Sequence, residues 1–237
     1  MGYAAAVGSK NEVGMLKLWG RPTSTRTLKV LWTLAEIDLP FELILASATM
    51  GAQGSVFKGN RPHGIVDGPA YRAMNPNGTV PTIDDAGFIL WESNAIVRYL
   101  AMRYAPRLLY GEDLATFARA CQWMDWDSAE LMRGQHTLVM QLVRLPAAER
   151  DRVQIETARE DLIAAFRILD AELGRRRFIA GDHFSMGDIP IGVHAHRWYL
   201  YDIERPPLVN LARWYAELRG RRAFQRWVEN PAHHLAG

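Results

Sequence analysis

The spacing of apolar residues divides the first part of the chain into short strand and helix patterns. Residues 15–19 form an apolar run typical of a buried strand, and residues 41–45 alternate as a second strand. Residues 25–37 predict a helix between them, because apolar side chains recur at spacings of three and four: Leu28, Leu31, Trp32 and Ala35. Pro40 lies just beyond the end of this helix. The predicted order is strand, helix, strand.

A hairpin and a second helix follow a long irregular segment. Residues 46–70 are glycine-rich and weakly patterned, and an irregular stretch of this length in a compact domain is usually functional or partly disordered. Residues 81–84 and 88–90 then predict two strands joined by a turn, and residues 93–104 predict a helix. Residues 15–104 are therefore expected to form one small α/β domain, preceded by a loose extension at 1–14.

The remainder of the chain is predicted to be helical. Residues 105–113 are expected to be a linker and residues 114–237 an all-helical domain. Its first helix carries a heptad-like stripe that should face a core: Leu114, Phe117, Cys121, Met124, Ser128 and Leu131. Trp123 and Trp126 then fall on the opposite, polar side, which suggests a second contact, either a subunit interface or the wall of a pocket; the alternative is incidental packing under a neighbouring helix.

A strong helix start is predicted near residue 185. Ser185 and Asp188 have the spacing of a capping box, and Phe184 and Ile189 stand where a hydrophobic staple would close around it. We expect this combination to begin a buried helix and to serve structure rather than chemistry.

Composition narrows the class of protein. A chain of 237 residues that is 49% hydrophobic can bury a core in one large domain or two modest ones. The net charge of +2 gives no general reason to expect nucleic acid or an anionic membrane as a partner. The single cysteine, Cys121, excludes an internal disulfide framework and fits a reducing cytoplasm. No run approaches the roughly 20 apolar residues of a membrane span, and residues 1–14 lack the pattern of a signal peptide.

Two dipeptides indicate a ligand site. Val80-Pro81 follows a turn-rich segment at the start of a predicted strand, where a cis bond before proline is usually kept. A cis bond would turn the N–H and C=O of Val80 away from the sheet, toward the backbone of a ligand. Glu92-Ser93 opens the helix at 93–104, and a serine N-cap there would leave free N–H groups beside a carboxylate. Such a site fits a ligand with a peptide backbone at one end and an amino-acid zwitterion at the other, and glutathione is such a ligand.

These features, in this order, resemble those of the cytosolic glutathione transferases over roughly residues 15 to 230. The similarity rests on Val80-Pro81, Glu92-Ser93, the order of strands and helices, and the helix start at Ser185. The resemblance implies a thioredoxin-like N-terminal domain of βαβ-ββα order, an all-α helical-bundle C-terminal domain and a homodimer. It also implies glutathione as co-substrate, no tightly bound cofactor, and a glutathione site formed by Thr79, Val80, Pro81, Glu92 and Ser93.

The start of the helix at 25–37 is the predicted site of the chemistry. Thr23, Ser24 and Thr25 lie there near the positive end of a helix dipole, and no cysteine accompanies them. A hydroxyl at this place can donate to the sulfur of bound glutathione and favour its thiolate. Ser24 is our candidate, because bacterial members of the resembling family have Gly-Arg-x-x-Ser before this helix and Lys-Val beginning five residues after the serine, as at 20–24 and 29–30 here. Thr23 and Thr25 are the competitors, and any of the three can simply cap the helix.

Two departures from the family pattern leave parts of the site open. Arg26 stands where the resembling group often has asparagine, which can change the charge of the pocket or supply another anion contact. The loop at 46–70 is longer than usual, and three of its side chains are candidates to bind the glycine carboxylate of glutathione: Lys58, Arg61 and His63. Solvated loop charges are the simpler interpretation of these three.

No metal site is expected. His194 and His196 are two apart on a predicted helix and point to nearly opposite sides.

Three functions fit this pattern. The first is attack of the glutathione thiolate on a hydrophobic electrophile. The second keeps the site but changes the acceptor, giving glutathione-dependent reduction of peroxides or disulfides, or dehalogenation. The third is a non-catalytic binding module of the same fold. Ser24 and the Glu92-Ser93 pair favour an enzyme, whereas the acceptor pocket is built from variable helical surfaces and does not identify its substrate.

Overall fold

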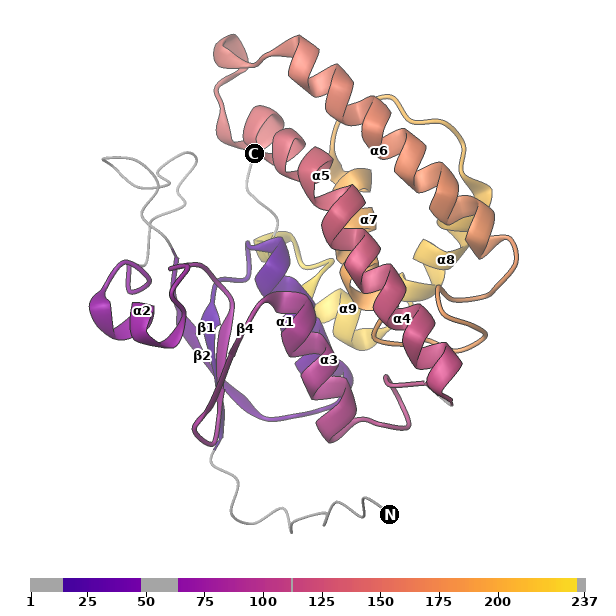
Figure 1. Cartoon of the computed structure of the whole chain (residues 1–237). Helices are drawn as coiled ribbons and strands as arrows, with labels where there is room; N and C mark the ends of the chain where they lie inside the picture. The colour runs from indigo at the N-terminus through magenta and orange to yellow at the C-terminus, as the bar shows by residue number, and fades with distance from the viewer. Residues whose placement is uncertain (1–14, 48–63, 112, 234–237) are drawn as a thin grey trace.

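The computed structural model describes residues 15–47, 64–111 and 113–233, which form a small sheet unit beside a larger helical one (Figure 1). The sheet unit contains β1 (Leu16–Gly20), α1 (Thr25–Glu36), β2 (Phe41–Leu45), α2 (Pro69–Met74), β3 (Thr82–Asp85), β4 (Phe88–Trp91) and α3 (Ser93–Tyr104). The predicted βαβ-ββα order is confirmed. The short helix α2 is an addition that the sequence pattern did not predict.

The four strands form one mixed sheet in the order β2-β1-β3-β4. β1 runs parallel to β2, whereas β3 is antiparallel to both β1 and β4. A parallel pair needs a crossover connection, and α1 supplies it. α1 and α3 pack against each other between the sheet and the helical unit, and α2 lies on the outer side of the sheet (Figure 1).

The helical unit begins with a continuous run of four segments. These are α4 (Leu114–Trp126), the π-helical turn η2 (Asp127–Leu131), α5 (Met132–Leu138) and the π-helical turn η3 (Val139–Arg144). After the 3-10 turn η4 (Ala147–Glu149), the long helix α6 (Arg152–Leu173) packs against α5 (Figure 1). The remaining elements are α7 (Asp188–Leu200), α8 (Val209–Arg219), α9 (Arg222–Trp227) and the 3-10 turn η5 (Pro231–His233). Within the described residues, none of these helices combines the length and the apolar character that crossing a membrane requires.

One hydrophobic core joins the two units, because α1 packs against α7 and α9. Trp32 of α1 is fully buried, with its ring centroid 4.9 Å from that of Phe224 and 5.7 Å from that of Phe184. Gly192 of α7 faces the same indole, and a Cβ there would lie 2.9 Å from the ring atoms of Trp32. Only glycine therefore lets α7 approach α1 this closely.

The predicted core face of the helix that starts at Leu114 is only partly right: Met124 and Leu131 are fully buried and Phe117 and Cys121 pack against the core, but Leu114 and Ser128 are exposed. Leu114 is 74% exposed, whereas Trp123 is 8% exposed and belongs to the core, with Trp126 packed partly buried beside it. The buried side of α4 contains Ala120, because the backbone at Gly187 lies against it: a Cβ at Gly187 would be 3.0 Å from the Ala120 Cα. A small residue at a close helix contact is invisible to a pattern that scores only large apolar side chains. The two tryptophans therefore give no support to a second contact on a polar face.

The hydrogen bonds predicted between Ser185 and Asp188 are present, although α7 begins at Asp188 with Gly187 as its N-cap. The Ser185 N–H donates to the Asp188 carboxylate at 2.9 Å, and the Ser185 hydroxyl accepts from the Gly187 N–H at 3.3 Å. The same buried carboxylate accepts from the Ile179 N–H at 3.0 Å and the Trp214 indole at 2.8 Å. Asp188 thus ties the start of α7 to α8 and to the preceding loop, and burial raises its pKa.

Candidate functional site

Ser24 ends the turn that connects β1 to α1. Its backbone N–H donates to the Arg21 carbonyl at 3.0 Å, which closes the turn, and its extended backbone makes it the N-cap of α1. The Ser24 Oγ accepts from the Thr27 N–H at 3.4 Å. This bond is long for an N–H···O contact, and it uses the hydroxyl only as an acceptor. Ser24 therefore caps the helix and still has its own proton to donate to a ligand.

The five residues predicted to bind glutathione lie together. Thr79, Val80, Pro81, Glu92 and Ser93 line one shallow recess, and Arg26 of α1 completes its wall. The cis bond predicted between Val80 and Pro81 is confirmed. The recess lies between the loop before β3 and the start of α3. The β3–β4 hairpin separates these two segments along the chain, and the pairing of Thr82 with Trp91 brings them together.

The loop before β3 is held in place from α2 and its C-terminal end. The carbonyl of Thr79 accepts from the Tyr71 hydroxyl at 2.7 Å and from the Asn75 side-chain amide at 3.0 Å. Both donors also contact the Thr82 hydroxyl, and Tyr71, Asn75 and Thr82 are all buried. α2 thus supports the recess from behind, a role that the sequence pattern did not reveal.

Glu92, rather than Ser93, is the N-cap of α3, which corrects the sequence prediction. Glu92 has a φ of +71° and makes no side-chain bond to the helix, and Ser93 is the buried first residue of the helix. A positive φ is uncommon for a residue other than glycine, and such outliers cluster at ligand sites. The result is an exposed carboxylate beside the unpaired N–H groups of the first helical turn.

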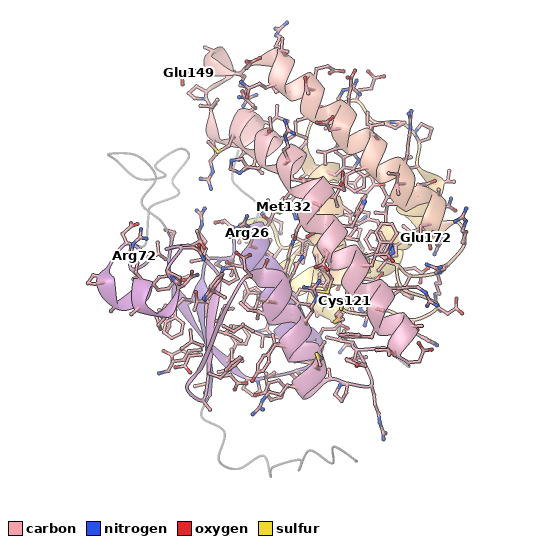
Figure 2. All side chains as sticks on the ribbon, in the orientation of Figure 1. Arg26, Arg72, Cys121, Met132, Glu149 and Glu172 are labelled. Atoms are coloured by element: carbon pink, nitrogen blue, oxygen red, sulfur yellow. The ribbon has the colours of Figure 1, made fainter. Side chains whose placement is uncertain are left out.

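Ser24 opens onto a cavity of about 300 Å³ between α1 and the helical unit. Arg26 lines both this cavity and the recess at Val80, so it stands between Ser24's cavity and the five predicted binding residues. The opposite wall comes from α5 and η3 and includes Met132 and Val139. Figure 2 shows Arg26 at the start of α1 and Met132 on the neighbouring helical run. The structure therefore places Ser24 and the five predicted binding residues in two neighbouring spaces, with Arg26 in the wall of both.

A buried polar cluster lies behind this site and was missed by the sequence analysis. Lys29 Nζ lies 2.6 Å from Asp127 Oδ2, and both side chains are essentially inaccessible to solvent. Asn94 of α3 donates to the Met124 carbonyl at 2.6 Å and lies 3.4 Å from both Lys29 Nζ and Asp127 Oδ2. Asp127 sits in a π-helical turn, a distortion often found at functional sites. The available signal was a lysine on the apolar face of a predicted helix.

His194 is the fourth member of this cluster and is almost fully buried. Its Nε2 lies 3.5 Å from Asp127 Oδ1, and neither ring nitrogen has a hydrogen-bond partner among the described residues. Burial lowers the pKa of His194 to about 3, and the opposing charge of Asp127 does not compensate. Burial also lowers the pKa of Lys29. Burial alone would raise the pKa of Asp127, but Lys29 and His194 together with hydrogen bonds hold it below its ordinary value.

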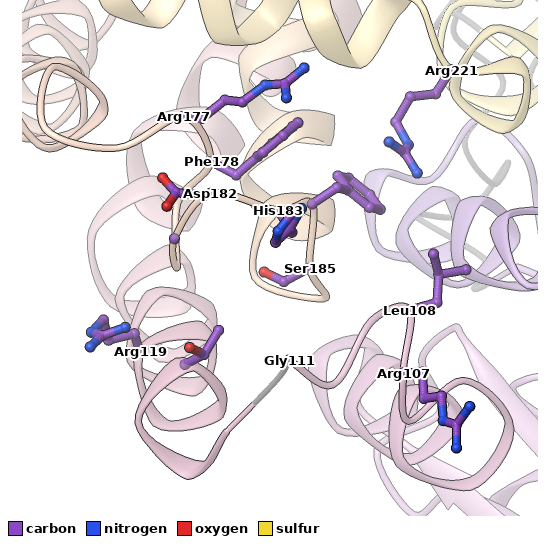
Figure 3. Close-up of a pocket in the computed structure, with 13 residues that line it drawn as sticks. Arg107, Leu108, Gly111, Arg119, Arg177, Phe178, Asp182, His183, Ser185 and Arg221 are labelled. Carbon is purple, nitrogen blue, oxygen red and sulfur yellow. The ribbon is translucent and has the colours of Figure 1, made fainter.

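A larger cleft, of about 610 Å³, lies elsewhere and shares no lining residue with the cavity at Ser24 (Figure 3). It is rich in arginine, but three of these side chains already have partners. Arg177 pairs with Glu217 at 2.8 Å, Arg221 pairs with Glu36, and Arg119 donates to the Ala180 carbonyl at 3.3 Å. The residue predicted to carry the chemistry, Ser24, lines the smaller cavity and not this cleft.

Within residues 15–47, 64–111 and 113–233, no group of three or more His, Cys, Asp or Glu side chains could hold a metal ion. The two nearby histidines contact different residues. His196 Nδ1 lies 2.8 Å from the Tyr215 hydroxyl, whereas His194 lies beside Asp127. The loop candidates Lys58, Arg61 and His63, and the extension at 1–14, lie outside the described residues.

Comparison with known proteins agrees with this geometry. Profiles described as glutathione S-transferase N-terminal and C-terminal domains match residues 23–103 and 147–217. The chain is 40% identical to glutathione S-transferase GstB of Escherichia coli K12, covering 92% of this chain and 99% of that protein, and 30% identical to glutathione S-transferase 3 of Zea mays, covering 90% and 93%. A theta class glutathione S-transferase from Xanthomonas axonopodis pv. citri, solved with glutathione bound, superposes with a TM-score of 0.81 at 40% identity, covering 91% and 97%. The chain belongs to the glutathione S-transferase family.

Proposed function

We propose that the protein binds glutathione along the recess at Val80 and transfers its thiolate to an electrophile in the cavity at Ser24. The single observation that carries this proposal is that Arg26 lines both spaces, so the recess and the cavity lie side by side. Family membership and the glutathione-bound structure of the Xanthomonas relative support glutathione as the ligand. A thiol donor in the recess would then face an acceptor in the cavity.

Ser24 is proposed to favour the thiolate by donating its hydroxyl proton to the sulfur. A free thiol has a pKa of about 8.5, so lowering it to about 7 requires about 2 kcal/mol. One hydrogen bond to a charged group contributes about 1.5 to 3 kcal/mol, and a helix N-terminus adds about 0.3 to 1 kcal/mol. Ser24 at the N-cap of α1 combines both effects, so one serine suffices.

The two ends of glutathione have separate proposed partners. The backbone groups at Val80 are suited to the peptide part of the ligand, and the exposed carboxylate of Glu92 is suited to its ammonium group. The first N–H groups of α3, at Ser93, are suited to the γ-glutamyl carboxylate. This arrangement binds a zwitterion with both of its charges matched.

The acceptor is proposed to be an electrophile with an apolar body. Met132 and Val139 offer it an apolar wall across from Ser24, and holding both reactants at one site supplies much of the acceleration. A homodimer and a cytoplasmic location belong to this proposal on family grounds, together with the single cysteine, which suits a reducing compartment.

The test combines binding with a panel of acceptors. Calorimetry with glutathione and with S-methylglutathione measures the site without turnover, and 1-chloro-2,4-dinitrobenzene, cumene hydroperoxide and a mixed disulfide then report the reaction class. We expect binding of both peptides and conjugation of the aryl chloride. Binding without any turnover would identify a non-catalytic module, turnover of the peroxide or disulfide alone would identify a reductase, and no binding would overturn the proposal.

A further inference from the structure

The cavity beside Ser24 carries an excess of positive charge. Three arginines line it, Arg21, Arg26 and Arg144, and none of its lining residues in the described part of the chain is an aspartate or a glutamate. On the proposed function, glutathione occupies the recess on the far side of Arg26. The charge of Arg21, which lines the cavity beside Ser24, therefore lies at the place of the other substrate.

Arg21 is held at the cavity by the same turn that positions Ser24. Its carbonyl accepts the Ser24 N–H at 3.0 Å, so the two residues keep a fixed relation. The Arg21 side chain is half-buried, and its Nε is buried without a hydrogen-bond partner among the described residues. A guanidinium is a fork of five donors shaped to fit a carboxylate or phosphate. Because Arg21 lines the cavity, its guanidinium can present donors to an anionic ligand there.

Two further buried arginines, Arg144 and Arg197, add positive charge to this part of the structure. Arg144 is 6% exposed and Arg197 is 3% exposed, and Arg197 donates to the carbonyls of Thr23 at 3.4 Å and His233 at 3.1 Å. Burial, and then the charge of Arg144, lowers the pKa of Arg21 to about 10. The same two causes lower the pKa of Arg197. The buried carboxylate of Asp127 does not offset these charges, because Lys29 pairs with it.

The opposite side of the cavity offers two apolar side chains beside the polar groups of Gln135, His136 and Arg144. Met132 and Val139 lie on the helical run α5–η3 across from the turn that carries Arg21 and Ser24. A ligand that fills about 300 Å³ can therefore place a carbon skeleton against one wall and an acidic group against the other.

We propose that the acceptor is an organic electrophile bearing an acidic group, typified by a carboxylate, and that Arg21 binds this group while the reactive carbon lies at Ser24. In the reaction, the thiol proton leaves for solvent, the thiolate sulfur forms a bond to the electrophilic carbon, and the leaving group departs with its bonding electron pair. Arg21 takes no part in bond making. It orients the acceptor and selects acceptors by charge.

The test uses two aryl chlorides with the same reactive carbon. 4-Chloro-3,5-dinitrobenzoate carries the acidic group, and its methyl ester is neutral. Each rate is divided by the rate of the same compound with free glutathione, which removes the difference in intrinsic reactivity. We expect kcat/KM for the benzoate to exceed that for the ester by about tenfold or more, the effect of one charge-assisted hydrogen bond.

Three variants assign the preference to Arg21. Arg21→Gln should remove most of the preference through a higher KM for the benzoate, with KM for glutathione and kcat/KM for the ester unchanged. Arg21→Lys, which keeps the charge, should restore part of it. Arg133→Gln is the matched control, because Arg133 is an exposed arginine on α5 outside this cavity, and it should behave as wild type.

The outcomes separate this inference from the proposed function. Equal normalised rates for the two chlorides in the wild-type enzyme would overturn the anionic acceptor and leave the transferase intact. A rise in KM for glutathione rather than for the benzoate in Arg21→Gln would assign Arg21 to glutathione and also overturn the inference. No turnover of either chloride would contradict the proposed function itself.

Discussion

Lys29 of α1 and Asp127 of η2 form a buried ion pair with 2.6 Å between Nζ and Oδ2, and this pair joins the sheet unit to the helical unit directly behind the site. Breaking such a pair from one side leaves an uncompensated buried charge. We therefore predict that Lys29→Met lowers the free energy of unfolding by about 3–5 kcal/mol, measured by guanidinium denaturation.

The double variant separates charge from packing. Lys29→Met combined with Asp127→Asn should cost less than the sum of the two single variants, because no unpaired charge remains. Lys17→Met, at an exposed position of β1, is the control and should change stability by less than about 0.5 kcal/mol. A loss below about 1 kcal/mol in Lys29→Met would show that the pair contributes little.

The buried His194 predicts a specific dependence of stability on pH. Its pKa is about 3 in the folded protein, against an ordinary value of 6.5, and the charges facing it come from Asp127, Lys29, Arg197 and Arg26. Between these two pH values the unfolded chain binds a proton that the folded protein does not. His194 should therefore make the unfolding free energy fall as pH falls from 6.5 to 5, with a slope that approaches about 1.4 kcal/mol per pH unit at the lower end.

The measurement is urea denaturation at a series of pH values in that window. His194→Gln should remove this part of the slope, whereas His136→Gln, at an exposed position, should leave the slope as it is in the wild type. An identical slope in the wild type and in His194→Gln would contradict a buried neutral imidazole.

Glu92 is predicted to recognise the ammonium group of glutathione. Its carboxylate makes no bond to its own helix and is exposed at the recess. Glu92→Gln removes the charge but keeps the shape, so glutathione affinity should fall about 10- to 150-fold, the value of one hydrogen bond to a charged group. Glu42→Gln, on an exposed position of β2, should not change it.

A ligand analogue makes this prediction sharper. A glutathione analogue without the γ-glutamyl amino group should bind the wild type and Glu92→Gln equally well in calorimetry. If Glu92→Gln weakened both ligands to the same degree, the carboxylate would act on the shape of the recess and not on the ammonium group.

The sequence predicted the fold well because its strongest signals are local. Val80-Pro81 and the Ser185–Asp188 box each require a particular residue at a particular turn, and both are present in the structure. The sheet order follows from the same short patterns, since a parallel β1–β2 pair demands a crossover helix.

The sequence was weaker wherever a contact between distant elements decides the outcome. The core face of α4 was predicted only in part: Ala120 is buried by the approach of Gly187, a contact that periodicity does not encode. Lys29 and Asp127 are 98 positions apart in the sequence, and the cavity at Ser24 draws its far wall from α5 and η3. The N-cap of α3 was predicted at Ser93 but is Glu92, because the positive φ of Glu92 overrides the capping preference of serine.

The central claim is that the Ser24 hydroxyl stabilises the thiolate of bound glutathione. Its most direct test is the ultraviolet absorbance of the thiolate, titrated with pH in the enzyme–glutathione complex of the wild type and of Ser24→Ala. We predict a thiol pKa of about 7 in the wild type and a rise of about 1–2 units in Ser24→Ala, with glutathione still bound and turnover largely lost. An unchanged thiol pKa in Ser24→Ala would contradict the account and pass the role to Thr23, Thr25 or a backbone amide.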